Sequence, residues 1–320
     1  MNRLGIGFIG AGGVARVHMK NIADIEHAKI VAVTDIQTEA AKRAASEYNA
    51  RAYADAEQMM DNENLDAIFL CVPPFAHSEL EEKVVARNIH LMVEKPVELE
   101  LSRAKEKAKM IESSGIINAS GYCLRYWDLV AKAKELLGNQ TVAMVRGQYL
   151  SSFVNTPWYR HQEKSGGQLV EQSTHIVDLV RYLAGDVKTV SADMALTVSK
   201  HIEGLDIPDV SSVNMRLHSG AIANLTSTFT QPDHRMGIEL LGNGFRIEVS
   251  GRTLTYVTAD DTKTISSYED FYKAQDQAFI EAVRQGDQTL VKASYQEGVD
   301  TLAVTLAANQ SFQTGKMIHI

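Results

Sequence analysis

The first 120 residues alternate short apolar runs with longer stretches whose apolar residues recur at helical spacing. The runs are rich in Ile, Val, Leu and Phe, which is typical of strands buried on both faces of a parallel sheet. They predict strands at residues 4–9, 30–34, 67–71, 90–93 and 117–120. The spacing predicts helices at residues 14–24, 38–48, 78–87 and 102–113. Ser102 is expected to cap the last helix and Gly115 to end it. This strict alternation indicates a doubly wound parallel sheet with right-handed crossovers.

The pattern changes after residue 121. Helices are expected at residues 127–137, 173–183, 271–284 and 295–314. Runs with β-branched residues predict strands at 189–198, 210–217, 221–230, 236–241, 245–250 and 253–258. Two glycine-containing tripeptides, His218-Ser219-Gly220 and Gly242-Asn243-Gly244, separate strands as hairpin turns do. The sequence therefore predicts an α/β protein of two domains, residues 1–121 with the parallel sheet and residues 122–320 with an antiparallel one.

Composition and charge narrow the class of protein. The 320 residues are 45% hydrophobic and 22% charged, which excludes a disordered or collagen-like chain. A formal charge of −8 argues against a nucleic-acid surface. No apolar run approaches the length of a membrane span, and the glycine-rich residues 1–15 do not resemble a signal peptide. With only Cys71 and Cys123 and no disulfide framework, the expected location is the cytoplasm.

The clearest chemical signal is a glycine loop between the first strand and the first helix. Gly10-Ala11-Gly12-Gly13-Val14-Ala15 fits G-x-G-x-x-A, the phosphate-binding turn of Rossmann dinucleotide folds. The first glycine permits the sharp turn, and the second lets a pyrophosphate approach the backbone. The helix N-terminus then offers N–H groups and a positive dipole end. The alternative is an ordinary glycine turn.

A carboxylate after the second strand bears on the choice of cofactor. Asp35 follows Ala15 by 20 residues, where a carboxylate accepts hydrogen bonds from the ribose hydroxyls. An anion there repels a 2′-phosphate, and the next residue, Ile36, supplies no positive charge. The sequence therefore favours NAD as cofactor and leaves NADP open.

Two further strand ends lie at the carboxyl edge of the predicted sheet, where ligands bind in such folds. Cys71-Val72-Pro73-Pro74 is expected to form a stiff loop against the cofactor, and the alternative is a simple strand terminator. His77 beyond it is interpreted as structural in preference to catalytic, and it is counted among the cofactor contacts. Glu94-Lys95-Pro96 closes a buried strand, which places Lys95 over the cofactor instead of in a solvated turn. The expected cofactor contacts at this edge are Gly10, Gly12, Gly13, Val14, Ala15, Asp35, Ile36, Val72, Pro73, Pro74, His77, Glu94 and Lys95.

The helix that follows Gly166-Gly167 carries Glu171, His175 and Asp178 on one face. Three interpretations fit this spacing: a solvated polar face, a metal site, or an acid–base relay in which His175 titrates near neutrality. The relay is favoured. No second histidine cluster or cysteine lies nearby in the sequence, so we expect no tightly bound metal.

The glycine loop, Glu94-Lys95-Pro96 and the double-glycine segment before His175 together resemble the Gfo/Idh/MocA oxidoreductases, which include glucose–fructose oxidoreductase and inositol dehydrogenases. The resemblance extends through residues 121–126 to the closing residues 313–318. It implies a Rossmann domain followed by an α+β domain with a large open, mainly antiparallel sheet. It also implies hydride transfer between a nicotinamide and a hydroxyl or carbonyl carbon, commonly on a sugar or cyclitol.

The resemblance also implies roles for single residues. Lys95 matches the active-site lysine and His175 the active-site histidine, so Lys95 would donate a hydrogen bond to the reacting oxygen and His175 would take its proton. Glu171 replaces the aspartate of many members, and Gln172 stands where many are apolar. The expected catalytic residues are Lys95, His175 and Glu171, and the expected substrate contacts are Lys95, Tyr126, Trp158, Gln172 and His175. Arg125 is a further expected cofactor contact, and Tyr159 is a candidate contact on the substrate or nicotinamide side. Core packing is the alternative for the aromatic residues.

Two other functions remain open at this point, because the same architecture serves them. One is an enzyme that retains its cofactor for redox-cycling epimerisation or elimination, and the other is a regulator that binds a dinucleotide without turnover. Few helices are expected to cover the second sheet, so its free face predicts a homodimer or homotetramer. No nucleic-acid or membrane partner is expected.

Overall fold

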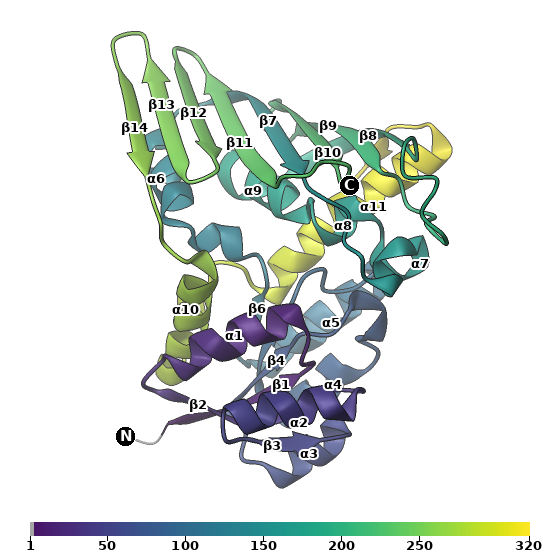
Figure 1. The fold of residues 1–320 in the computed structure, drawn as a ribbon. Coiled ribbons are helices and arrows are strands. Elements are labelled where there is room, and N and C mark those ends of the chain that lie inside the picture. The colour runs from purple at the N-terminus through teal and green to yellow at the C-terminus, as the bar shows by residue number, and fades with distance from the viewer. Residues whose placement is uncertain (1–2) are drawn as a thin grey trace. The chain divides into compact units, whose positions relative to one another are not determined.

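The computed structural model describes residues 3–320 and divides into two compact units (Figure 1). Met1 and Asn2, part of the stretch expected to lack a signal peptide, lie outside the described residues. The first unit runs to Tyr126 and also includes Asp270–Val299, and the second comprises Trp127–Glu269 and Asp300–Ile320. This division differs from a single boundary at residues 121 and 122, because residues 270–299 pack with the first unit. Within residues 3–320, no helix is long and apolar enough to cross a membrane.

The first unit contains a six-stranded parallel sheet in the order β3-β2-β1-β4-β5-β6. Its strands are β1 (Leu4–Ile9), β2 (Ala28–Thr34), β3 (Arg51–Tyr53), β4 (Ala67–Leu70), β5 (His90–Val93) and β6 (Asn118–Ser120). Its helices are α1 (Gly13–Ala23), α2 (Thr38–Glu47), α3 (Ala56–Asn62), α4 (Leu80–Val85), α5 (Leu101–Ser114) and α10 (Phe271–Gln285). The expected doubly wound fold is confirmed, and the strand order reverses between β1 and β4, where ligands bind in such sheets.

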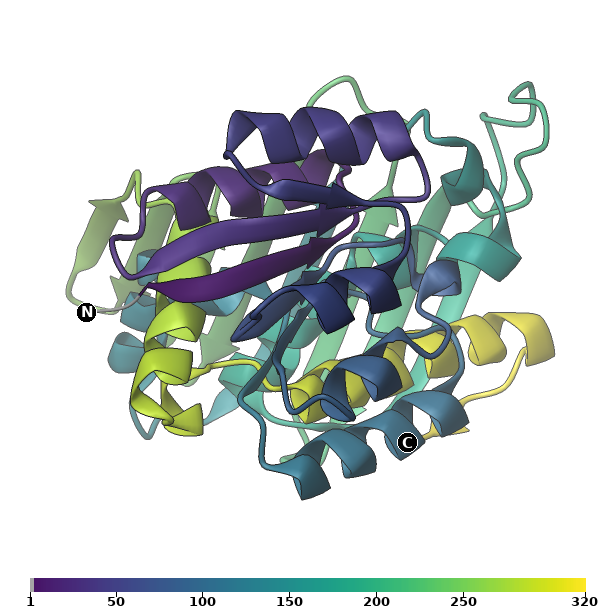
Figure 2. The same ribbon diagram turned by 90° about the horizontal axis from the view of Figure 1, so that it is seen from below.

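The inner strands β1 and β4 are apolar because helices cover both faces of this sheet (Figure 2). One face packs against α1, α2 and α10 in a core that includes Phe8, Met19, Phe69 and Phe279. The Phe69 and Phe279 rings meet edge to face with centroids 5.4 Å apart. Helix α10 therefore completes the first core, although it follows that core's strands by 150 residues.

Several sequence predictions in this unit need correction. Strand β3 and helix α3 were not expected, since β3 has three residues and two of them are exposed. Helix α4 is shorter than residues 78–87, because Ser78 has a positive φ of 45° that a helix does not accept. Ser102 lies inside the first turn of α5, and the capping position belongs to Glu100. Gly115 ends α5 in the left-handed conformation, as predicted.

The second unit contains a nine-stranded sheet in the order β14-β13-β12-β11-β7-β10-β9-β8-β15. Its strands are β7 (Val142–Leu150), β8 (Val187–Ala195), β9 (Val210–Leu217), β10 (Ile222–Thr228), β11 (Arg235–Gly242), β12 (Phe245–Ser250), β13 (Thr253–Thr258), β14 (Thr262–Ser266) and β15 (Ile318–His319). Strands β7 and β10 pair in parallel and the remaining pairs are antiparallel, which confirms a mainly antiparallel sheet.

Three of these strands, β7, β14 and β15, were not predicted, because their apolar residues are interrupted or few. Strand β8 stops at Ala195 instead of reaching residue 198. The reason is a turn in which the carboxylate of Asp209 accepts the N–H groups of Thr197, Val198 and Ser199 at 2.8–2.9 Å. These bonds hold the pKa of Asp209 below its usual range despite its burial.

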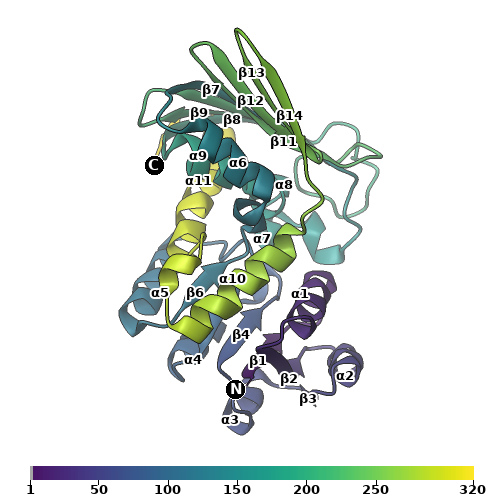
Figure 3. The same ribbon diagram turned by 90° about the vertical axis from the view of Figure 1, so that its left-hand side faces the viewer.

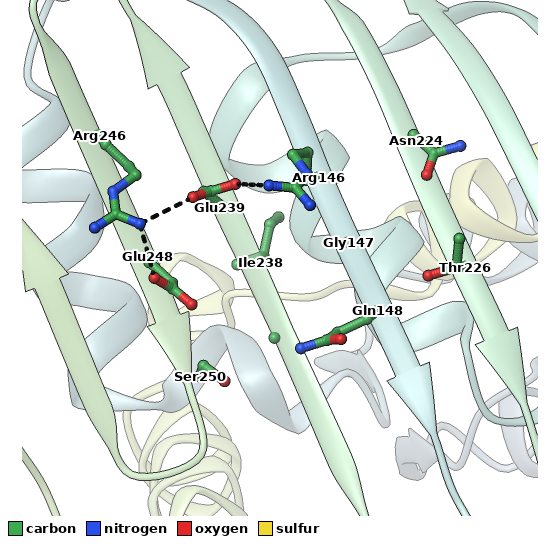
Figure 4. A pocket seen from close by; sticks show the side chains of 11 residues that line it. Arg146, Gly147, Gln148, Asn224, Thr226, Ile238, Glu239, Arg246, Glu248 and Ser250 are labelled. Atoms are coloured by element: carbon green, nitrogen blue, oxygen red, sulfur yellow. Dashed lines mark hydrogen bonds and ion pairs between the residues drawn. The ribbon is translucent and has the colours of Figure 1, made fainter.

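Helices cover one face of this sheet (Figure 3). They are α6 (Asp128–Leu137), α8 (Gln168–Glu171), α9 (Thr174–Ala184) and the part of α11 (Tyr295–Thr314) after Val299, and a short helix, α7 (Gln162–Ser165), also belongs to this unit. The opposite face carries a row of charged side chains on neighbouring strands (Figure 4). Arg146 and Arg246 both bind Glu239, at 3.0 and 3.3 Å, and Arg246 also lies 3.3 Å from Glu248.

Candidate active site

The carboxyl ends of the parallel strands bring the predicted cofactor residues to one edge of the first sheet. Backbone hydrogen bonds continue past the strand ends: Gly10 donates to Thr34, Cys71 to Ile9 and Glu94 to Leu70. Asp35, the glycine loop, the proline loop and Glu94-Lys95 therefore follow the neighbouring strands β2, β1, β4 and β5, respectively. The sequence predicted that these segments end strands at one edge of the sheet, and the strand order makes those strands neighbours.

The fold requires a glycine at only one of the three glycine positions of the loop. Gly10 has a φ of 101°, and a Cβ there would lie 2.5 Å from the carbonyl oxygen of Cys71, so the fold itself requires glycine. Gly12 and Gly13 are exposed, and a Cβ on either would meet no atom of residues 3–320 within 4 Å. Gly12 stands at the N-cap of α1 and has a φ of −73° that any residue adopts. Packing within the fold therefore does not explain why residues 12 and 13 are glycines. A pyrophosphate bound at the helix N-terminus fits the open space above them.

Asp35 is tied to the glycine loop. Its Oδ2 accepts the N–H of Ala11 at 2.8 Å, and its Oδ1 accepts the N–H of Gln37 at 2.7 Å. The half-buried carboxylate is thus fixed beside the loop, with lone pairs left for ribose hydroxyls. Ile36 is 97% exposed next to it, an uncommon position for an isoleucine and one that suits the face of a base. These residues fit NAD.

The residues of the loop after β4 differ in how deeply they are buried. Val72 and Pro73 are half-buried, and Pro74 is buried at the start of a short 3-10 turn. The side chain of His77 is fully buried, with Nδ1 2.8 Å from Glu81 Oε1. Glu81 also accepts the ammonium of Lys107 at 2.9 Å, and these two partners hold its pKa down against burial. The contacts of His77 favour its structural interpretation.

Glu94 and Lys95 leave β5 in different environments. Glu94 is buried, and Lys95 is half-buried at the strand end. The Glu94 carboxylate accepts the backbone N–H of Lys95 at 3.1 Å and lies 3.0 Å from Nε2 of His18 on α1. His18 belongs to no motif in the sequence. Its one signal was a polar residue at a buried position of an amphipathic helix.

Arg125 and Tyr126 were expected near the cofactor and the substrate. Arg125 is buried, and it donates to the carbonyl of Lys292 at 2.8 Å and to Glu297 at 2.7 Å. The Tyr126 hydroxyl accepts the N–H of Lys292 at 2.8 Å. Both residues thus anchor the segment that leads into α11, contacts that match the core-packing alternative for Tyr126.

In the second unit, His175 is the second residue of α9 and is 8% exposed. The helix packs closely on β7 because Gly147 has no side chain. A Cβ there would lie 2.6 Å from Cγ2 of Ile176, the neighbour of His175. Gly147 thus sets the depth of the helix start that carries His175, a role that the sequence did not reveal.

The single helical face predicted for Glu171, His175 and Asp178 is not formed, because Glu171 ends α8 whereas His175 and Asp178 lie on α9. Asp178 turns into the unit's core. It is fully buried, and its carboxylate accepts a hydrogen bond from the Thr301 hydroxyl at 3.1 Å. The Thr301 hydroxyl in turn accepts a hydrogen bond from the Arg181 guanidinium at 2.9 Å. The two helices α9 and α11 share these bonds. Among the residues that the structure describes, no group of three His, Cys, Asp or Glu side chains is arranged to hold a metal ion.

Gln172 and Trp158 border an aromatic cluster formed by Phe153, Tyr159 and Phe229. The Tyr159 hydroxyl donates to Gln172 Oε1 at 2.8 Å. Burial, and next the charge of half-buried Glu171, raise the pKa of that hydroxyl well above its usual range. Gln172 is therefore oriented by a buried tyrosine, and Trp158 is half-buried beside it.

Comparison with known proteins covers both units. The family model described as "Oxidoreductase family, NAD-binding Rossmann fold" matches residues 4–122, and the "GFO/IDH/MocA C-terminal domain" matches residues 130–257. Myo-inositol 2-dehydrogenase of Thermotoga maritima is 25% identical, with 98% of each chain covered. scyllo-Inositol 2-dehydrogenase (NAD(+)) of Bacillus subtilis is 24% identical over 98% of this chain and 95% of its own. The structure of levoglucosan dehydrogenase with NADH and levoglucosan has the same fold, with a TM-score of 0.92, 18% identity and 100% of each chain covered.

Proposed function

Because the chain belongs to the Gfo/Idh/MocA family of NAD-binding oxidoreductases, we propose that it oxidises a secondary hydroxyl of a sugar, cyclitol or related polyol and reduces the corresponding ketone in reverse. The observation that carries the cofactor half of this proposal is the pair of exposed glycines, Gly12 and Gly13, whose absence of side chains serves no packing purpose among residues 3–320. The substrate class rests on the relatives, which are named inositol dehydrogenases.

The chain's own residues bind the dinucleotide from several strand ends. The N-terminus of α1 and the glycine loop hold the pyrophosphate, and the Asp35 carboxylate accepts the ribose hydroxyls. Ile36 covers the base, and Val72, Pro73 and Pro74 line the loop after β4. NAD, when bound, supplies a nicotinamide ring that accepts a hydride from carbon. Because Asp35 is an anion, NAD is preferred and NADP binds more weakly.

The proton chemistry belongs to His175 and Lys95. His175 takes the hydroxyl proton as a general base, and its imidazole suits this role because its ordinary pKa lies near neutrality. The Lys95 ammonium donates a hydrogen bond to the same oxygen and stabilises the negative charge that develops there. Glu171 orients this pair electrostatically, and Gln172, held by Tyr159, and Trp158 contact the substrate. In reduction, His175 returns the proton.

A substrate screen tests the function. Purified protein is mixed with NAD or NADP and a panel of sugars, cyclitols and their keto forms, and the reduced nicotinamide is followed by its absorbance. Turnover of a polyol that falls at least about 10²-fold in His175→Asn and in Lys95→Met, with NAD affinity kept, supports the assignment. Near-normal turnover in His175→Asn removes that residue as the base. Cofactor that stays bound through purification without net reduction indicates redox cycling instead.

The second sheet also supports an oligomer. Its helix-free face carries Arg146, Glu239, Arg246 and Glu248 in a self-complementary row (Figure 4), so two copies related by a twofold axis can exchange ion pairs. We expect a homodimer or homotetramer through this face. Light scattering at micromolar concentration tests it, and a monomer there refutes it. Arg146→Glu, which opposes Glu239 in both copies, is expected to shift the mass toward the monomer.

A further inference from the structure

Three buried ionisable side chains meet between α1, the end of β5 and α10. His18 on α1 is fully buried, with Nδ1 2.7 Å from Asp276 Oδ1 and Nε2 3.0 Å from Glu94 Oε1. Asp276 Oδ2 accepts the amide of Asn21 at 2.8 Å, and Glu94 Oε2 accepts the backbone N–H of Lys95 at 3.1 Å. One imidazole thus links the helix of the glycine loop to the strand end that carries Lys95.

Burying these three ionisable side chains costs desolvation free energy, so their presence in the core needs an explanation. Desolvation by itself lowers the pKa of His18, but the two carboxylates outweigh it and raise that pKa to about 10. At neutral pH the cluster therefore contains an imidazolium between two acids, and a buried ionic group of this kind is weak support for stability. Apolar side chains would fill the same space without a desolvation penalty.

The surrounding backbone is shaped to admit the Glu94 carboxylate. A Cβ on Gly121, at the end of the neighbouring strand β6, would lie 2.6 Å from the Glu94 carboxylate carbon and from its Oε1. The absence of a side chain at residue 121 leaves the carboxylate room to reach both His18 and the Lys95 N–H. Helix α1, the end of β5 and Gly121 after β6 thus all contribute to the surroundings of the Glu94 carboxylate, which binds the Lys95 N–H.

We propose that His18 is a positioning residue for Lys95: it orients the Glu94 carboxylate, whose other oxygen holds the Lys95 backbone N–H, and so fixes how β5 presents that lysine. The inference rests on the proposed function, in which Lys95 acts on the reacting oxygen. His18 does not touch the substrate. Asp276 supports it from the opposite nitrogen.

Two variants of His18 separate positioning from simple packing. The side-chain amide of Gln reaches the place of Nε2, so His18→Gln keeps a donor for Glu94 and loses the one for Asp276. The shorter amide of Asn reaches the place of Nδ1, so His18→Asn keeps Asp276 and loses Glu94. Both variants remove the same charge. Met19→Ala, which empties a fully buried site on the same helix, serves as a control for lost stability.

Hydrogen exchange followed by mass spectrometry gives a readout that needs no substrate. We expect the Lys95 amide, normalised to amides of β1, to exchange at least about tenfold faster in His18→Asn than in His18→Gln. In Met19→Ala the normalised rate stays that of the wild type. Equal rates in the two His18 variants, or a faster rate in His18→Gln, overturn the proposal.

Kinetics on a polyol identified by the screen give the second readout. His18→Asn is expected to lower kcat by about ten- to a hundredfold, with KM and NAD affinity nearly kept, because a small misplacement of a catalytic group slows only the chemical step. His18→Gln and Met19→Ala stay within about threefold of the wild type. If Lys95→Met keeps normal turnover, the proposed function fails. If Lys95→Met is inactive but the His18 variants do not differ, the positioning role alone fails.

Discussion

Alanine substitutions at Gly10 and Gly12 are expected to separate folding from cofactor binding, although the two glycines lie in one loop. Gly10→Ala places a methyl group 2.5 Å from the carbonyl oxygen of Cys71 and forces alanine to a φ of 101°. Gly12→Ala places the same methyl group where no atom of residues 3–320 lies within 4 Å, at an ordinary φ of −73°.

The magnitudes follow from these environments. An unfavourable positive φ costs roughly 1–3 kcal/mol, and a clash with backbone adds about 1–3 kcal/mol, so Gly10→Ala loses a large share of a typical domain's stability. Gly12→Ala restricts the unfolded chain and changes stability by less than about 1 kcal/mol in either direction. Its methyl group occupies the space assigned to the pyrophosphate, and overpacking of about 1.4–3 kcal/mol weakens NAD binding by about ten- to a hundredfold.

Urea unfolding and titration calorimetry with NAD measure the two effects on the same proteins. Gly12→Ala is expected to unfold like the wild type and to bind NAD poorly, while Gly10→Ala unfolds at clearly lower urea. Gly13→Val adds a second test, since that position is equally open. Wild-type NAD affinity in Gly12→Ala would refute the placement of the pyrophosphate, and a large loss of stability would refute the account of the open space.

Three other measurements probe the site. Asp35→Ser with Ile36→Arg should shift preference from NAD toward NADP, but at some loss of affinity for both, because the Asp35 carboxylate also holds the Ala11 N–H; tighter NADP binding by the wild type in calorimetry contradicts the assignment. The folded-state pKa of His18, about 10 against 6.5 for the unfolded chain, contributes stability that is present below pH 6.5 and lost as pH rises through 10. Unfolding free energies between pH 6 and 10 should therefore fall by a few kcal/mol more in the wild type than in His18→Gln, and parallel profiles would show that His18 is not charged in the fold. Chelation with EDTA should leave activity unchanged, and a loss that zinc or manganese restores would reinstate the metal interpretation of the His175 helix.

The sequence by itself determined the elements whose signals are local. Strands β1, β5, β9, β12 and β13 and helix α11 begin and end where the apolar pattern predicted. The glycine loop and Asp35 were visible because the turn, the helix start and the ribose contact fall at fixed spacings along the chain. Local patterns of this kind need no knowledge of what packs against them.

Features with weak local signals could not be predicted from the sequence. Strand β7 lies in the middle of its sheet, yet its polar residues hide it, and its parallel pairing with β10 depends on strands that are distant in the chain. Helix α10 was predicted correctly as a helix, but only packing assigns the second of its two phenylalanines, Phe279, to the first core. Amphipathic periodicity tells which face is buried and is silent about the partner.

The same limit applies to the site. Lys95 and His175 stood out because each follows a recognisable local motif. His18 and Asp276 did not, because their role lies in contacts that span the chain: His18 bonds Glu94, which is 76 residues away, and Asp276, which is 258 residues away. A buried charge is intelligible only through the groups that compensate it, and those groups are brought together by the tertiary structure and not by spacing in the chain.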